Sequence, residues 1–122
     1  MTLKSKPIVV SRKQSIEISP KSTGRGSGVN GGELLFAALA TCFCNDIYRE
    51  ATKRGIDIHD VKVEVTGRFG NPGEPARDIS YRVKVNGNAP QDAIDDLIRA
   101  TDSVTEIHNT LRAGCEVRLI LA

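Results

Sequence analysis

An almost unbroken run of apolar residues extends from Leu34 to Cys44, and only Thr41 within it is clearly polar. The run consists largely of strong helix formers, and nothing interrupts it before Gly55, so it predicts a long helix that glycine ends. A helix that is apolar on all sides is typical of a protein core. From Asn45 onwards polar residues take one side. We therefore expect a central helix whose first half is buried and whose second half reaches the surface.

Further segments alternate between apolar and polar positions, which is the pattern of strands with one buried face. Residues 61–65 and 79–85 alternate on either side of a turn rich in glycine and proline, and they predict an antiparallel hairpin. Residues 115–121 alternate in the same way and predict a terminal strand with Cys115 on its apolar face. Residues 7–10 and 15–18 are short β-rich runs that predict a small hairpin near the start of the chain.

Two shorter helices are predicted between the second hairpin and the terminal strand. Pro90 opens the first of them, and apolar residues at helical spacing give it an inward stripe. The stripe comprises Ala93, Ile94, Leu97, Ile98 and Thr101. Ser103 and Glu106 have the spacing of a capping box, so a third helix is expected over residues 104–112, with Gly114 ending it.

The predicted element order is β-β-α-β-β-α-α-β, with no linker long enough to separate domains. A chain of 122 residues has room for one modest core, so we expect one domain over residues 1–122. Mostly antiparallel strands with segregated helices place it in the α+β class. The glycine-rich residues 21–32 fit neither a nucleotide-binding fingerprint nor a P-loop, and we interpret them as a flexible connector.

The charge pattern excludes some classes of partner. Seventeen basic and fifteen acidic residues give a net charge of +2, and the two kinds are dispersed among each other. This pattern gives no footprint for nucleic acid or for an anionic membrane. The chain contains no apolar signal segment and no run of membrane-spanning length, so a cytoplasmic location is the default expectation.

The three cysteines are an odd number, which favours free or redox-active thiols over a disulfide scaffold. On a helix, Cys42 and Cys44 point about 200° apart. Cys44 falls on the apolar side and is interpreted as a packing residue. Cys42 falls where an apolar surface meets polar groups, with Arg49 two turns further on, and a nearby cation raises the thiolate fraction. From the residues alone, Cys42 is equally consistent with a reactive thiol and a buried one.

A metal site is not expected from the cysteine spacing, because the two helical sulfurs diverge. For the same reason a disulfide between them would require the helix to unwind. Two further ligands would be needed for zinc, and His59 and His108 offer no matched spacing. We interpret Cys115 as core packing. His108 is either an exposed helix residue, which we rank first, or a pocket wall.

Three stretches of the chain resemble the OsmC/Ohr family of osmotically inducible and organic hydroperoxide resistance proteins. Residues 32–43 resemble that family's central-helix signature, which ends in a reactive cysteine. Residues 54–56 leading into 61–65, and residues 108–114, also match. The similarity spans roughly residues 15–121. It implies an OsmC-like fold with antiparallel sheets around a long buried central helix. It also implies an intertwined homodimer in which two central helices pack together and active sites lie at the subunit interface.

The resemblance also implies a chemistry and a set of site residues. Peroxidase members of the family use a cysteine to attack an organic hydroperoxide, and a second cysteine then condenses with the sulfenic acid. Cys42 matches the attacking position. Thr105 stands where the second cysteine is expected, so an external thiol would resolve the sulfenic acid unless Cys44 or Cys115 does so. Glu33 stands one residue after the family's activating glutamate, and Arg25 is a loose match to its loop arginine.

Two functions follow as hypotheses. The first is an enzyme of the oxidative stress response, with peroxiredoxin-like activity: it reduces organic hydroperoxides with Cys42 as nucleophile, Glu33 as helper and a dithiol as reductant. The alternative is a non-catalytic OsmC-like dimer that binds a small apolar ligand or a partner at the subunit interface. Neither hypothesis requires a cofactor or a metal, and neither involves nucleic acid or a membrane.

Overall fold

The computed structural model describes residues 8–11 and 14–121. They belong to two compact units, Met1–Leu35 and Phe36–Ala122, which are described separately. The first unit contains an antiparallel hairpin of β1 (Ile8–Ser11) and β2 (Gln14–Glu17), which confirms the predicted small hairpin. The start of the first predicted strand at residue 7 and the turn at residues 12–13 lie outside the described residues.

The segment that follows β2 is a folded loop. Its backbone carries two hydrogen bonds, from the N–H of Gly28 to the oxygen of Ser19 and from the N–H of Lys21 to the oxygen of Gly26. Pro20 and Ser27 form an isolated antiparallel bridge within it. The glycine-rich stretch therefore contains a local backbone structure that the composition did not indicate.

Helix α1 (Gly31–Lys53) is the long helix that the apolar run predicts. It ends as expected, because Gly55 adopts a φ of +67°, which glycine accepts at little cost. Within a single chain, the prediction that the first half of α1 is buried is wrong. Between residues 36 and 44 only Leu39 and Phe43 are buried, whereas the second half buries Ile47 and Ala51 in the core.

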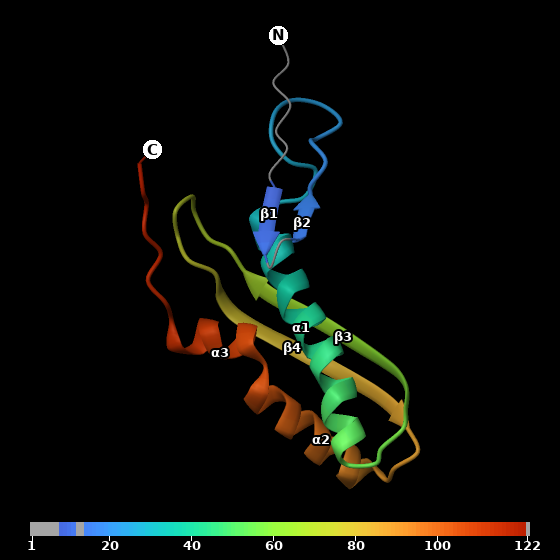
Figure 1. The fold of residues 1–122 in the computed structure, drawn as a ribbon. Coiled ribbons are helices and arrows are strands. Elements are labelled where there is room, and N and C mark those ends of the chain that lie inside the picture. The colour runs from blue at the N-terminus through green and yellow to red at the C-terminus, as the bar shows by residue number, and fades with distance from the viewer. Residues whose placement is uncertain (1–7, 12–13, 122) are drawn as a thin grey trace. The chain divides into compact units, whose positions relative to one another are not determined.

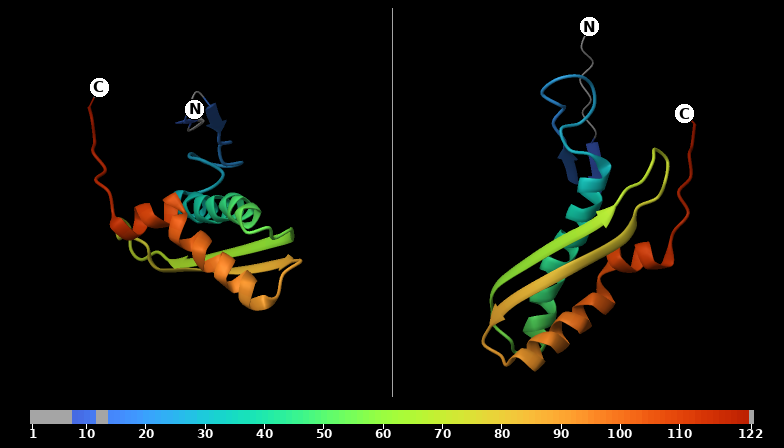
Figure 2. Two further views of the ribbon diagram at one scale, coloured as in Figure 1. Left: turned by 60° about the horizontal axis from the view of Figure 1, so that its bottom comes forward. Right: turned by 180° about the vertical axis from the view of Figure 1, so that it is seen from behind.

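The second unit is built on an antiparallel hairpin of β3 (Ile58–Arg68) and β4 (Arg77–Gly87), in which Val63 faces Val83. The valines of both strands share one face with Tyr81, which confirms the predicted alternation. Helix α1 crosses the hairpin on one side, and the reverse view shows the strands in front of it (Figures 1 and 2). The apolar face of the hairpin therefore meets the second half of α1.

Helix α2 (Gln91–Val104) completes this core with the predicted inward stripe. Its Ile94 and Leu97 are buried together with Phe43 and Ile47 of α1. Burial of a side chain of this size stabilises a fold by about 1.5–3 kcal/mol. The core thus holds α1 and α2 against the hairpin, and the α+β class is confirmed.

Helix α3 (Glu106–Ala113) begins later than predicted, and the proposed capping box is wrong. Ser103 lies in the last turn of α2, where its hydroxyl donates to the carbonyl of Ala100, so it does not cap α3. The N-cap position belongs to Thr105. Gly114 ends α3 as predicted, with a φ of +71° and its N–H bonded to the carbonyl of Thr110.

The segment after α3 differs from the prediction in a second way. Residues 114–121 form no strand, and Figure 1 shows them leading away from α3. Val117 is 90% exposed and Leu121 is 83% exposed, and Cys115 is exposed instead of packed in the core. An alternating segment forms a strand only where a sheet edge offers backbone partners, and within the described chain the segment has none. No helix in the described part of the chain could cross a membrane.

Candidate thiol site on helix α1

The half-buried thiol of Cys42 lies in the middle of α1. Its S–H donates to the Oδ2 atom of Asp46 over 3.7 Å, and the two residues are neighbours because they are four positions apart on one helix. Asp46 is itself buried, with 6% of its surface exposed. The polar groups that the sequence predicted beside Cys42 are therefore present, and Asp46 is the one that contacts the thiol.

Arg49 does not contact the sulfur in the way that the sequence suggested. Its Nη1 atom pairs with Oδ1 of Asp46 at 3.1 Å, and its Nε atom lies 3.4 Å from a carboxylate oxygen of Glu50. Lys53 also pairs with Glu50, at 3.0 Å. Arg49 therefore holds the carboxylate of Asp46 in place, and it acts on Cys42 only through that carboxylate. Its own pKa is raised by Asp46 and by its hydrogen bond with Glu50.

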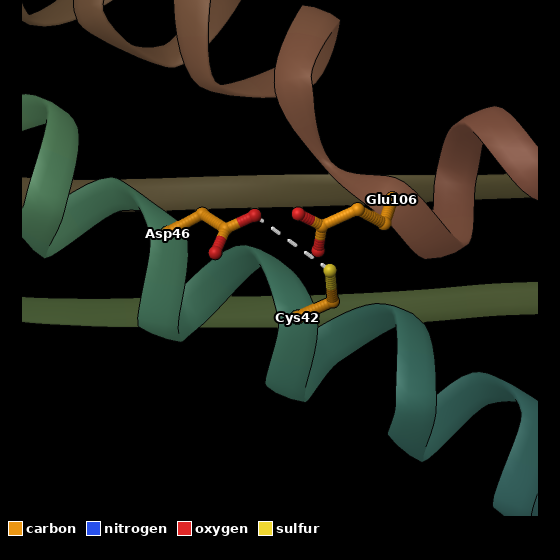
Figure 3. Close-up of side chains that lie close together, drawn as sticks. All are labelled: Cys42, Asp46 and Glu106. Carbon is orange, nitrogen blue, oxygen red and sulfur yellow. Dashed lines mark hydrogen bonds between the residues drawn. The ribbon is translucent and has the colours of Figure 1, made fainter.

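A second carboxylate reaches the thiol from another helix. Sγ of Cys42 and one carboxylate oxygen each of Asp46 and Glu106 lie within 4.8 Å of one another. Figure 3 shows the three side chains converging from α1 and α3. Thiolate and carboxylate together are ligands for a metal ion. This grouping was not predicted from the sequence. The only signal for it was the resemblance, which sets Thr105, next to Glu106, where a second cysteine that reacts with Cys42 is expected.

His108 lies on the buried side of α3, in the wall of a pocket that is separate from the Cys42 grouping. It is 4% exposed, and its ring centroid lies 4.7 Å from the ring centroid of Tyr81 and 6.3 Å from that of Phe43. The preferred interpretation of His108 as an exposed residue is thus wrong. Neither ring nitrogen has a hydrogen-bond partner among the described residues. Burial lowers the pKa of His108, Arg112 lowers it further, and the imidazole is therefore neutral at pH 7.

His108 borders a hollow of about 310 Å³. The hollow is lined by Leu39, Ala76, Arg77, Asp78, Ile79, Tyr81, His108, Leu111 and Arg112. This volume is at the lower end of the range for small-molecule pockets, and the wall combines apolar side chains with a few polar ones. The hollow could hold a small apolar molecule.

A network of polar groups fixes the elements around the hollow. The hydroxyl of Tyr81 donates to Asp102, and Nη2 of Arg112 pairs with the same carboxylate at 2.7 Å. Although burial opposes it, the hydrogen bonds from Tyr81 and Arg112 lower the pKa of Asp102. Burial and the bond to Asp102 raise the pKa of Tyr81. These contacts tie β4, α2 and α3 together.

The remaining candidate residues are Glu33, Arg25 and Cys44. Glu33 belongs to the first unit, where it forms a capping box with Asn30 at the start of α1. Arg25 is an exposed residue of the loop in the same unit. A catalytic role for either one stays a prediction. Cys44 is half-buried, and burial raises the pKa of its thiol.

Comparison with known proteins decides the family. A family model described as OsmC-like protein matches residues 24–120. The chain belongs to the OsmC family. This confirms the resemblance seen in the sequence. A search of curated proteins finds no match.

Solved structures of OsmC-like proteins share the fold. The chain superposes on an OsmC-like protein from Mycoplasma pneumoniae with a TM-score of 0.68 at 22% identity, covering 88% of this chain and 79% of that one. An OsmC-like hydroperoxide resistance protein from Jannaschia sp. gives a TM-score of 0.62 at 18% identity, with 89% and 75% covered. An organic hydroperoxide resistance protein from Legionella pneumophila gives 0.59 at 18% identity, with 92% and 90% covered. At these identities the likeness establishes an OsmC-like fold.

Proposed function

We propose that the protein reduces organic hydroperoxides with Cys42 as the nucleophile and an external thiol as the reductant. The observation that carries the proposal is the position of Cys42: it is a half-buried thiol in the central helix of an OsmC-like fold, hydrogen-bonded to a carboxylate. Two of the structures that share the fold are hydroperoxide resistance proteins, which supports the choice of substrate.

The reaction begins with proton transfer from the thiol of Cys42 to Asp46, whose Oδ2 atom accepts the S–H hydrogen bond. The sulfur attacks the terminal oxygen of the hydroperoxide, and the O–O bond breaks. The leaving alkoxide takes the proton from Asp46 and departs as an alcohol, so Cys42 is left as a sulfenic acid. An external thiol then attacks this sulfur and displaces water. A second external thiol cleaves the mixed disulfide and restores Cys42.

An external reductant is proposed because the other two cysteines are poorly placed to resolve the sulfenic acid. Cys44 follows Cys42 by two positions on a continuous helix, so the two side chains point in different directions. Cys115 lies beyond α3 in the exposed terminal segment, and Thr105 occupies the start of α3. A small dithiol such as dihydrolipoamide supplies both thiols that the reaction needs.

We further propose that the protein acts as a homodimer in the cytoplasm. An isolated chain leaves the apolar residues of its terminal segment exposed, and it also leaves much of the first half of α1 incompletely buried. A second copy would cover both surfaces. In this proposal Glu33 assists catalysis only if the partner subunit brings it to the thiol, since within its own chain it caps α1.

The activity test uses the purified chain with cumene hydroperoxide and either dithiothreitol or dihydrolipoamide. We expect hydroperoxide consumption that Cys42→Ser abolishes and that the matched variant Cys44→Ser retains. A rate that Cys42→Ser leaves unchanged would contradict the proposal. Glu33→Gln separates the proposed helper from the cap, because glutamine preserves the acceptor oxygen for the Asn30 N–H while it removes the charge.

A second candidate function is ligand binding without catalysis. The hollow beside His108 favours it, because apolar side chains supply much of its wall. Native mass spectrometry against lipid and acyl extracts tests this function: a bound small molecule supports it, and the absence of both a bound species and ligand-dependent stabilisation contradicts it.

A further inference from the structure

The grouping of Cys42, Asp46 and Glu106 has the composition of a metal site. It offers one sulfur and two carboxylate oxygens from two different helices, all within 4.8 Å of one another. A zinc ion accepts both thiolate and carboxylate ligands, and sites with three protein ligands leave a fourth position for water. Magnesium and calcium prefer all-oxygen sites, so the sulfur selects against them.

The geometry needs little movement to accept such an ion. Zinc–sulfur and zinc–oxygen bonds in a tetrahedral site place their ligand atoms roughly 3.5 Å apart. Sγ of Cys42 and Oδ2 of Asp46 are already 3.7 Å apart. Arg49 binds the other oxygen of Asp46, which holds Oδ2 toward the sulfur in the manner of an outer-shell partner. Glu106 has an exposed side chain and can close the remaining distance.

His108 does not belong to this grouping. It follows Glu106 by two positions on α3, so the two side chains point in different directions, and its ring borders the separate hollow.

We propose that Cys42, Asp46 and Glu106 form a binding site for one divalent cation of the zinc class, with a fourth position open to water. Binding releases the thiol proton, because the thiolate is the ligand form of cysteine. The cation and an organic hydroperoxide therefore compete for the same sulfur. The site does not depend on the peroxidase proposal, since its test measures binding and not turnover.

Cobalt(II) is the probe for this site, because its bond to a thiolate produces a charge-transfer absorption band. The reduced, metal-free full chain is titrated with Co²⁺ under anaerobic conditions. We expect one Co²⁺ per chain with a thiolate band, and displacement of that band by excess Zn²⁺ but not by Mg²⁺. Glu106→Gln is the most informative variant, because Glu106 is exposed and its replacement leaves the core intact. We expect it to weaken Co²⁺ binding by at least about tenfold.

The controls distinguish this site from other thiols. Cys42→Ser must abolish the thiolate band, and Cys44→Ser must leave the band and the affinity unchanged. Three results would overturn the proposal: no thiolate band, a band that survives Cys42→Ser, or an affinity that Glu106→Gln leaves unaltered. None of them would affect the hydroperoxide assay, which is run without metal in the presence of a chelator.

Discussion

Replacing His108 with phenylalanine should stabilise the protein. The ring of His108 is buried against Tyr81 and Phe43, and neither of its nitrogens has a hydrogen-bond partner in the part of the chain that the structure describes. A phenylalanine ring can keep the aromatic contacts without burying a donor and an acceptor. The adjoining hollow leaves room for the larger ring.

The expected gain follows from the two unpaired nitrogens of His108. A buried polar group without a partner costs about 1–3 kcal/mol, so the donor and the acceptor together cost at least about 2 kcal/mol. Fitting the larger ring between Tyr81 and Phe43 costs about 1 kcal/mol, the low end for overpacking, because the adjoining hollow offers some room. The free energy of unfolding should therefore rise by about 1 kcal/mol in His108→Phe. For a chain of 122 residues this corresponds to an increase in Tm of about 3–5 °C.

Urea denaturation followed by circular dichroism measures this difference, with both proteins at pH 7 and at one fixed concentration. Tyr81→Phe is the matched control, because it removes the hydroxyl that donates to Asp102. We expect that variant to lose about 1 kcal/mol, the opposite sign. A loss of more than about 1 kcal/mol in His108→Phe would refute the reasoning, since it would mean that the imidazole has a partner in the folded protein.

Three other predictions use different parts of the second unit. Gly67→Ala should destabilise the protein by about 1–3 kcal/mol in urea, because the new Cβ would lie 2.7 Å from Cζ of Phe36; an unchanged midpoint would contradict this packing. The lowered pKa of Asp102 contributes stability above its ordinary value of 3.8, and this contribution disappears as the pH falls through the folded value. Asp102→Asn should therefore be less stable at pH 7 and lose less stability in acid, and a parallel acid profile would refute the assignment. The alkylation rate of Cys44, measured with the other two cysteines replaced by serine, should rise with a pH midpoint above 9.0, and a midpoint below that value would argue against its burial.

The elements whose apolar faces pack against other parts of the same chain could be predicted from the sequence. The alternation of residues 61–65 and 79–85 predicted the hairpin because its apolar face packs within the same chain. The stripe of α2 and the glycine ends of α1 and α3 were predicted for the same local reason. The predicted terminal strand over residues 115–121 is wrong, because an alternating pattern forms a strand only when a partner edge is present. The incomplete burial of the first half of α1 was not predicted either, since the apolar content of a helix does not show which neighbour covers it.

The candidate site was predicted only in part. Cys42 and the polar side of its helix followed from helical geometry, and the structure shows that Asp46 is the polar residue that contacts the thiol. The carboxylate of Glu106 was missed because tertiary packing, and not sequence spacing, brings α3 to α1. The burial of His108 was missed because a polar residue on a short helix gives no periodic signal, and a buried imidazole without partners opposes the usual rule for polar groups.

Single-turnover mass spectrometry tests the central claim most directly, because it observes Cys42 itself. The reduced protein is mixed with one equivalent of cumene hydroperoxide, trapped with a reagent specific for sulfenic acid, and digested for peptide mapping. We predict an adduct of the trapping reagent on Cys42, formed together with one equivalent of alcohol, and no adduct when a dithiol is added before the reagent. Oxidation that appears first on Cys44 or Cys115, or an unmodified Cys42 after the hydroperoxide has been consumed, would contradict it.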